Sequence, residues 1–393
     1  MIDFNVLTER RNSGSMKWDA EGDSPDIIPL WVADMDFRAA PEIIDALKNR
    51  VDEGIFGYTY VGSDYYDALI NWNLRRHDWE IDRKRVIYTS GVVPALSAII
   101  KALTKPGEGV ILQTPAYNCF FSSIRNNKCR QIDNPLMRIE ENEGFSYEID
   151  FEGLEALASD PLNTLMILCN PHNPTGRVWN SGELEKVAEI CRRNGVVVVS
   201  DEIHCELVHP DQPAYIPYAT IDSSAIVCTS PSKAFNTAGL QIANIICPDD
   251  ETQRKIDRAI NDNEVCDVNP FGVVALKAAY NKSELWLAEL IDYLDNNRII
   301  LRGEFESAIP EIKFCNSEAT YLAWMDVSRL KIDGRPASGD EIADYLLKDS
   351  KVRIASGSTY GAPSYIRINY ACPKERLSEA VRRMTVSLRK LRN

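Results

Sequence analysis

The feature that most constrains the fold is an alternation of short apolar runs with helical stretches between residues 86 and 247. Runs of this length, bounded by turn residues, are typical of buried strands. The run at 196–199 consists of four consecutive valines, as expected for a parallel sheet that is covered on both faces. The alternation predicts an α/β protein with helices on both sides of a mainly parallel sheet. The predicted strands are residues 85–88, 109–113, 165–169, 196–200 and 225–228.

Polar residues follow three of these predicted strands. Asn173, Asp201 and Lys233 each come just after an apolar run. Ligands of open α/β sheets bind beyond the carboxyl ends of the strands, so one cleft can hold all three residues. A lysine that turns into such a cleft loses solvation, which lowers its pKa and frees its amine for Schiff-base chemistry. The alternative for a lone lysine is a solvated surface position.

Two further stretches suggest a cofactor site. Thr89-Ser90-Gly91-Val92-Val93-Pro94 lies between a strand and the helical residues 95–103, so the N–H groups of Gly91 and Val92 are candidates for phosphate binding. Tyr117 follows the strand at 109–113, where its ring can stack on a cofactor. The alternatives are an ordinary strand-to-helix turn and a core tyrosine.

Composition limits the classes of function. The formal net charge of −14 opposes non-specific binding to nucleic acid. We expect no membrane span, since no apolar run approaches about 18 residues, and no secretory signal at the N-terminus. The ten scattered cysteines indicate reduced thiols and a cytoplasmic location. With four histidines and no visible His/Cys cluster, a metal site is not expected; His77 is predicted at the surface, and His172 and His209 as structural.

Seven motifs, in order, resemble fold-type I enzymes dependent on pyridoxal 5′-phosphate (PLP), in the class I/II aminotransferase superfamily. The closer resemblance is to the MalY/PatB group of carbon–sulfur β-lyases, the cystathionine β-lyases. The motifs are Lys17-Trp18-Asp19, the stretch from Pro29 to Phe37, Phe56-Gly57-Tyr58, Gly91-Val92-Val93-Pro94-Ala95-Leu96, the stretch from Asn170 to Trp179, Ser200-Asp201-Glu202-Ile203-His204 and Pro231-Ser232-Lys233.

The resemblance implies a large PLP-binding α/β/α domain over residues 46–271 and a smaller α+β domain over 272–393. Residues 1–45 would form an arm that contributes to the smaller domain. It also implies a homodimer with active sites at the subunit interface, where Tyr58 reaches the phosphate of the neighbouring subunit. The expected reaction is β-elimination from L-cystathionine, L-cysteine or related S-conjugates, giving a thiol, pyruvate and ammonia.

The same resemblance assigns cofactor contacts. Lys233 would carry the cofactor and act as the base at Cα, and Asp201 would bond the pyridine nitrogen. Asn173 would bond the phenolic oxygen. Ser230 and Ser232 flank the lysine, and the family position favours Ser230 over Ser232 as the phosphate ligand. His204 stands where most of the superfamily has a tyrosine, so its role is either cofactor contact or support.

On the substrate side, Arg367 would clamp the α-carboxylate in two parallel hydrogen bonds, and Ala33 and Asp34 would border the substrate. Gln241 replaces an arginine that often pairs with the phosphate in the superfamily. Two other functions remain open: an aminotransferase on the same fold, and a PLP-sensing regulator without turnover.

Overall fold

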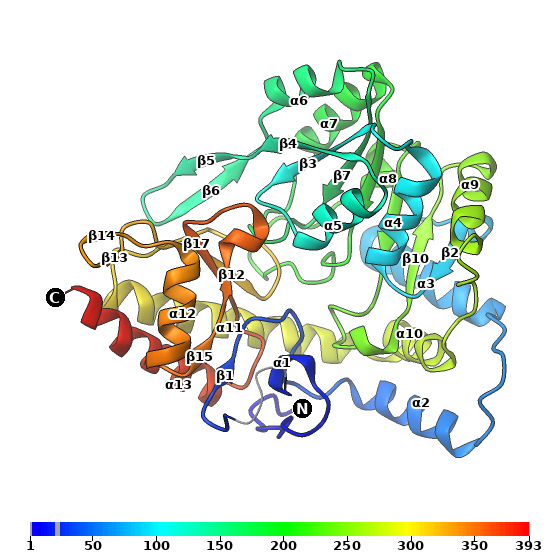
Figure 1. Cartoon of the computed structure of the whole chain (residues 1–393). Coiled ribbons are helices and arrows are strands. Elements are labelled where there is room, and N and C mark those ends of the chain that lie inside the picture. The colour runs from blue at the N-terminus through cyan, green and yellow to red at the C-terminus, as the bar shows by residue number, and fades with distance from the viewer. Residues whose placement is uncertain (1, 20–23, 393) are drawn as a thin grey trace.

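A central seven-stranded sheet dominates the computed structural model, which describes residues 2–19 and 24–392 (Figure 1). The strand order is β2-β10-β9-β8-β7-β3-β4, and every strand pair is parallel except the two that β10 forms. This arrangement confirms the predicted α/β architecture with a mainly parallel sheet. The strands are β2 (Val86–Thr89), β3 (Gly109–Thr114), β4 (Arg130–Pro135), β7 (Asn163–Cys169), β8 (Val197–Asp201), β9 (Ile226–Thr229) and β10 (Ala243–Ile246).

Helices cover both faces of this sheet because its strands are apolar on both sides. On β3, Val110 and Leu112 pack into one buried cluster, whereas Ile111 between them packs into another. One cluster is completed by α4 (Val92–Leu103), α5 (Asn118–Asn126) and α9 (Asp250–Asn261). The opposite cluster is completed by α6 (Phe151–Ala158), α7 (Ser181–Asn194) and α8 (Tyr218–Ile221).

The strand ends that matter for function lie level with one another. In the sheet register, Cys169 at the end of β7 pairs with Asp201 of β8, which in turn pairs with Cys228 of β9. The antiparallel β10 begins at the same edge, since Ala243 pairs with Thr89 at the end of β2. The segments that follow β2, β7, β8 and β9 and the segment that precedes β10 therefore meet at one edge.

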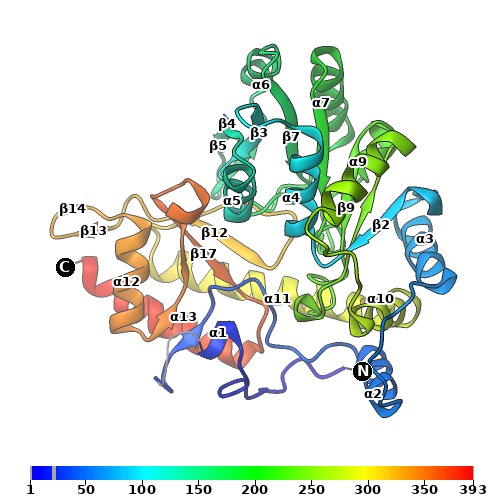
Figure 2. The same ribbon diagram turned by 45° about the vertical axis from the view of Figure 1, so that its right-hand side comes forward.

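A second, four-stranded antiparallel sheet lies beside the first, in the order β11-β12-β17-β16 (Figure 2). Its strands are β11 (Lys313–Phe314), β12 (Leu322–Asp326), β16 (Ala355–Ser356) and β17 (Tyr365–Asn369). It packs with α11 (Glu284–Ala308), α12 (Gly339–Asp349) and α13 (Lys374–Arg389). The apolar stretch from Val273 to Arg302 is two helices, because α10 (Pro270–Lys282) ends at Ser283 before α11 begins.

The N-terminal part is more ordered than its polar sequence indicates. We expected residues 1–30 to be irregular, but α1 (Met16–Asp19) lies in this stretch, and β1 (Ile28–Pro29) pairs in parallel with β15 (Val352–Arg353). Two further helices follow, α2 (Pro41–Asp52) and α3 (Ser63–His77); both pack on α10. The remaining strands of the described residues form two short hairpins, β5 (Met137–Glu140) with β6 (Phe145–Glu148) and β13 (Lys331–Ile332) with β14 (Arg335–Pro336). Within the described part of the chain, none of the helices is both long and apolar enough to cross a membrane.

Candidate active site

A cavity of about 310 Å³ lies at the edge where the strand ends meet. It brings together most of the residues predicted from the sequence, although they come from six separate segments of the chain. Those that line it are Ala33, Gly91, Val92, Tyr117, Asn173, Asp201, His204, Ser232 and Lys233. Gln241, which stands in the place of a superfamily arginine, lines it as well.

Lys233 presents its amine to this cavity. It follows β9 in a turn, and its Nζ donates a hydrogen bond to the carbonyl of Ala33 at 2.8 Å. Burial, with a smaller contribution from the Arg367 guanidinium, lowers the pKa of Lys233 to about 8. Far more of this amine is therefore unprotonated near neutral pH than in an ordinary lysine, as a nucleophile or base requires.

Asp201 is a buried carboxylate at the carboxyl end of β8. Its Oδ1 accepts a hydrogen bond from the backbone N–H of Ile203 at 3.2 Å. Burial raises the pKa of Asp201 to about 7, because this bond and the nearby Lys233 compensate only part of the lost hydration. A cationic group in the cavity would stabilise the charged form.

His204 lies in the turn that follows Asp201 and is buried. Burial, together with the charges of Lys233 and Arg367, lowers the pKa of His204 to about 3, so the ring is neutral. Its Nδ1 is buried without a hydrogen-bond partner. A polar atom left in this condition inside a cavity is typical of a ligand-binding group.

The N-terminus of α4 forms another wall of the cavity. Gly91 is the N-cap residue and makes no side-chain cap, so the N–H groups at the start of this 12-residue helix point out of it without a capping partner. Ser232 and Gln241 also line the cavity. Ser230 does not: its hydroxyl donates to the carbonyl of Ile242 at 2.7 Å and accepts from the backbone N–H of Ser232 at 3.1 Å.

Arg367 approaches from the second sheet, on β17. Its Nη1 donates to Asn173 Oδ1 at 3.2 Å and its Nη2 to the carbonyl of Trp31 at 3.0 Å. The guanidinium carbon lies 4.6 Å from the centre of the Tyr360 ring. Arg367 does not itself line the cavity but contacts the lining residue Asn173, and its Nε is buried with no hydrogen-bond partner.

Asp34 and Tyr58 do not line the cavity. The Asp34 carboxylate forms ion pairs with Arg10 at 2.9 Å and Lys17 at 3.5 Å, so it is engaged by the N-terminal segment. Tyr58 is 97% exposed, on the segment between α2 and α3. Within one subunit it has no part in the site.

Sequence reasoning missed Tyr321, which is buried and whose hydroxyl donates to the carbonyl of Ala33 at 3.1 Å. No local signal marks it, because it precedes β12 of the second sheet. Asn236 was also passed over, although it ends the motif around Lys233. Its side chain binds both the N–H and the carbonyl of Met35, each at 3.0 Å.

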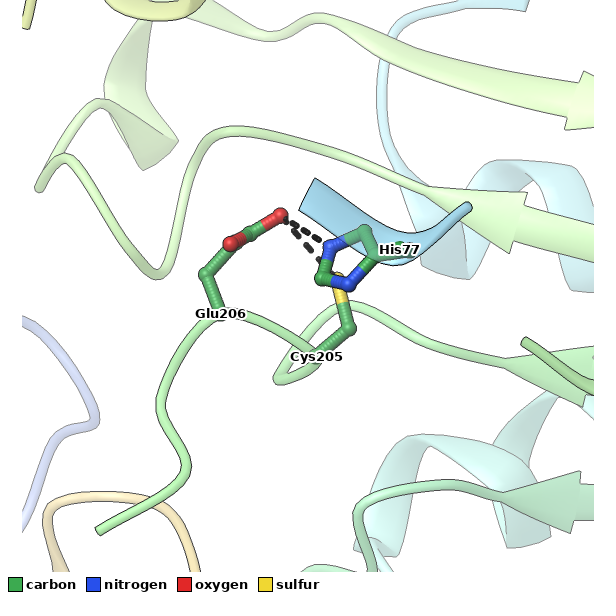
Figure 3. Close-up of side chains that lie close together, drawn as sticks. All are labelled: His77, Cys205 and Glu206. Atoms are coloured by element: carbon green, nitrogen blue, oxygen red, sulfur yellow. Dashed lines mark hydrogen bonds and ion pairs between the residues drawn. The ribbon is translucent and has the colours of Figure 1, made fainter. Parts of the chain in front are cut away.

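One prediction about the histidines was wrong. His77 does not lie free at the surface; its Nε2 lies 2.7 Å from Glu206 Oε1, with Cys205 beside them (Figure 3). This trio has the composition of a metal site, which the sequence concealed because the residues are far apart in the chain. However, Glu206 also accepts from the Trp72 indole at 2.6 Å and pairs with Arg76 at 3.2 Å. The carboxylate is thus already saturated by donors, one of them a permanent cation, and ties α3 to the turn after β8.

The sequence pattern of one family, described as aminotransferase class I and II, matches residues 25–384. The chain belongs to this family. The fold agrees, with a mostly parallel sheet whose cavity lies beyond the strand ends.

Among curated proteins, the chain is similar to the cystathionine β-lyase PatB of Bacillus subtilis (strain 168), with 38% identity covering 98% of this chain and 100% of the relative. Among solved structures it is similar to the PLP-bound C–S lyase from Staphylococcus hominis, with 32% identity, 98% and 99% of the two chains covered and a TM-score of 0.89. It is also similar to a PLP-bound structure from Clostridium difficile 630 that is described as a candidate aminotransferase, with 37% identity, 98% and 99% coverage and a TM-score of 0.93.

Proposed function

We propose that this protein is a PLP-dependent carbon–sulfur β-lyase, which eliminates a thiol from L-cystathionine, L-cysteine or a related S-conjugate and leaves pyruvate and ammonia. One observation carries the proposal. The Lys233 amine, with its lowered pKa, faces the same cavity as the buried Asp201 carboxylate and the N-terminus of α4. The similarity to a cystathionine β-lyase and a C–S lyase over nearly the whole chain selects this chemistry within the family.

The residues of the cavity fit PLP. Asp201 has a raised pKa that a cationic ring nitrogen would offset, and His204 Nδ1 lacks a partner. The α4 N-terminus, with Gly91 and Val92, offers N–H groups and the positive end of a helix dipole to a phosphate. Ser232 and Gln241 would add donors, whereas Ser230 would support the loop, because its proton is already bound by Ile242. Tyr117 and Asn173 would contact the ring and its phenolic oxygen.

When bound, PLP supplies an electron sink for the Cα of an amino acid, so that a leaving group on Cβ can depart. The protein's part is to hold the cofactor and the substrate and to move the proton. Lys233, whose lowered pKa leaves far more of the amine unprotonated at neutral pH than in an ordinary lysine, would take the proton from Cα at its Nζ. Because His204 stays neutral, it would orient by hydrogen bonding rather than by charge.

Arg367 would bind the α-carboxylate of the substrate. Its Nε donor is unsatisfied, and its two terminal nitrogens are fixed by Asn173 and Trp31. A guanidinium held in this way can bind a carboxylate in a defined orientation by donating hydrogen bonds to it. Orientation matters because the bond to be broken at Cα must align with the cofactor.

The decisive test separates elimination from amino transfer, the second candidate that the family allows. Purified protein loaded with PLP is incubated with L-cystathionine without any keto acid, and pyruvate is measured. We expect pyruvate to accumulate over many turnovers. If pyruvate is absent and amino transfer starts only when a keto acid is added, the protein is an aminotransferase.

The active unit would be a homodimer. The segment at 54–62 exposes several large apolar side chains: Ile55 by 76%, Phe56 by 57%, Tyr58 by 97% and Tyr60 by 86%. Such a group of exposed apolar side chains is typical of an interaction surface. Tyr58 would enter the neighbouring subunit's site and bind the phosphate there. The ten unpaired cysteines suit a reducing compartment, the cytoplasm.

A further inference from the structure

Five consecutive backbone carbonyls beside the cavity, those of residues 31–35, each accept a side-chain hydrogen bond. We call residues 31–36 the substrate strap. Two of the donors are the central residues of the site, Lys233 and Arg367. The bonds run to Trp31 from Arg367 (3.0 Å), to Val32 from Asn369 (2.5 Å), to Ala33 from Lys233 (2.8 Å), to Asp34 from Asn369 (2.6 Å) and to Met35 from Asn236 (3.0 Å).

The N-terminal segment, residues 10–19, holds the same strap through other bonds. Lys17 Nζ donates to the carbonyl of Asp34 at 3.2 Å, and Arg10 Nη1 donates to that of Met35 at 3.1 Å. Asp19 folds the segment, since its carboxylate accepts backbone N–H groups of Asn12, Ser13 and Ser15. This fold directs Arg10 and Lys17 toward the strap.

Asp36, at the end of the strap, is the centre of this arrangement and is only 1% exposed. Its Oδ1 lies 2.8 Å from Arg10, 3.2 Å from Lys17 and 2.9 Å from the Trp18 indole nitrogen. Its Oδ2 lies 3.1 Å from Arg376 on α13. Burial by itself would raise the pKa of Asp36, but Lys17, Trp18, Arg376 and Arg10 hold it below its usual value.

The Lys17 side chain is fully buried, and its amine forms ion pairs with Asp34 and Asp36. A buried ion pair adds little net stability, but it is highly sensitive to the loss of one partner. It also accepts few geometries, because each desolvated donor must keep its acceptor. A network of this kind is better suited to fixing the position of a backbone segment than to adding stability.

We propose that Lys17, Trp18 and Asp36 are positioning residues, which fix the substrate strap and thereby the Arg367 guanidinium for the substrate carboxylate. The inference rests on the proposed carboxylate site at Arg367. It also assigns a role to Lys17 and Trp18 of the motif Lys17-Trp18-Asp19, which has no part in the proposed reaction. The positioning residues Lys17, Trp18 and Asp36 do not line the cavity. They therefore act through Trp31, Ala33 and Arg367.

The test replaces Lys17 by methionine (Lys17→Met), which keeps the length of the side chain and removes its charge. The ligand is L-alanine, an amino acid without a leaving group, whose binding to the PLP-loaded enzyme is followed in the visible spectrum. We expect the apparent Kd of L-alanine and the KM of L-cystathionine to rise together by about 10- to 100-fold, the range of a small misplacement. The affinity for PLP and kcat should change by less than about threefold, well under the 1.4 kcal/mol of a tenfold effect.

Glu206→Gln is the matched control. Glu206 is likewise a buried carboxylate held by an arginine, a second basic residue and a tryptophan indole, but it does not contact the strap. It should lower the melting temperature and leave the Kd of L-alanine unchanged. If Lys17→Met is insoluble, Trp18→Phe removes the indole donor to Asp36, keeps an aromatic ring beside Arg376, and should raise that Kd by a smaller factor.

The proposal is overturned if the soluble variant melts at a lower temperature but binds L-alanine as the wild type does, or if Glu206→Gln weakens L-alanine binding equally. Failure of the proposed function would look different. A wild-type enzyme that binds PLP and L-alanine but releases no pyruvate refutes the lyase, and the comparison of L-alanine affinities still decides the role of Lys17.

Discussion

Lys233 and Arg367 are coupled through charge, and the coupling has a pH-dependent consequence. The amine must be unprotonated to react with the aldehyde of PLP. With the pKa of Lys233 lowered to about 8, the rate of cofactor loading should rise with pH up to about 8 and then level off. The Arg367 charge contributes to the lowered pKa of Lys233. Arg367→Met should therefore move the midpoint of the pH–rate profile of cofactor loading to higher pH. Stopped-flow absorbance from pH 6 to 10 measures both profiles; identical midpoints would contradict the coupling.

Asp201 should oppose stability in the cofactor-free protein. Its folded-state pKa of about 7 lies above the ordinary value of 3.8 for an aspartate, so the folded state binds the extra proton between these values. The stability gained from that proton is complete at low pH and lost as pH rises toward 7. Asp201→Asn should therefore raise the melting temperature of the apo protein at pH 8 and have little effect at pH 4.

The pKa of Asp201 is raised by roughly three, so Asp201→Asn can change the free energy of unfolding by at most about 4 kcal/mol. The same variant should bind PLP more weakly, since the amide cannot neutralise a protonated ring nitrogen. Calorimetry of the apo and PLP-loaded forms gives both numbers. An apo protein that Asp201→Asn destabilises at pH 8 would show that the carboxylate has a structural role.

At the scale of elements, the start of α4 allows stability and cofactor binding to be separated. Gly91 has an extended backbone, and a Cβ there would meet only Pro94 at an ordinary 3.4 Å. Gly91→Asp should cap the helix and maintain or raise stability, because Asp is a favoured N-cap residue. Its negative charge should nevertheless repel the phosphate and weaken PLP binding by about tenfold or more.

Gly91→Asn is the matched control, with a cap of the same shape and no charge. The difference in PLP affinity between Gly91→Asp and Gly91→Asn measures the electrostatic contribution to phosphate binding. Pyridoxal, which lacks the phosphate, should bind both variants alike. Equal PLP affinities for the two variants would exclude a phosphate at this helix end.

The elements could be predicted where the sequence pattern decides them. The buried strands β7, β8 and β9 are continuous apolar runs, so their ends were placed within two residues. Other features depend on contacts between distant segments. The start of α3 at Ser63 is one of them, because its N-cap Gly62 gives no side-chain signal in the sequence.

The residues of the site, too, could be predicted only where the local sequence pattern decides their position. Asp201 ends β8, and Asn173 and Lys233 each lie four residues beyond the end of a strand, so their meeting follows from the sheet. By contrast, β1 pairs with a strand more than 300 residues away in the chain, and Tyr321 reaches Ala33 from the other sheet. Asp34 was expected at the substrate, but its carboxylate faces Arg10 and Lys17, which only the folded N-terminal segment reveals.

At the scale of the whole molecule, shared active sites can be tested by mixing subunits. Lys233→Ala lacks the reactive amine, and Tyr58→Asp would place a negative charge against the partner's phosphate. Each homodimer should be nearly inactive. In a hybrid dimer, one site combines an intact Lys233 with an intact Tyr58 from the partner.

If equal amounts exchange freely, half of the dimers are hybrids with one good site of two, so about a quarter of the wild-type activity should return. Pyruvate release after unfolding and refolding of the mixture measures it, with each variant refolded alone as the control. No recovery, in a mixture shown by mass to contain hybrids, would contradict a shared site.

We propose that β-elimination by this protein depends on Lys233. The most direct measurement compares the initial rate of pyruvate release from L-cystathionine by the wild type, by Lys233→Ala and by Lys186→Ala, a surface substitution on α7, all with excess PLP and no keto acid. We expect Lys186→Ala to match the wild type and Lys233→Ala to lose at least about 100-fold, the lower range for a general base. Lys233→Ala releasing pyruvate at the wild-type rate would contradict the account.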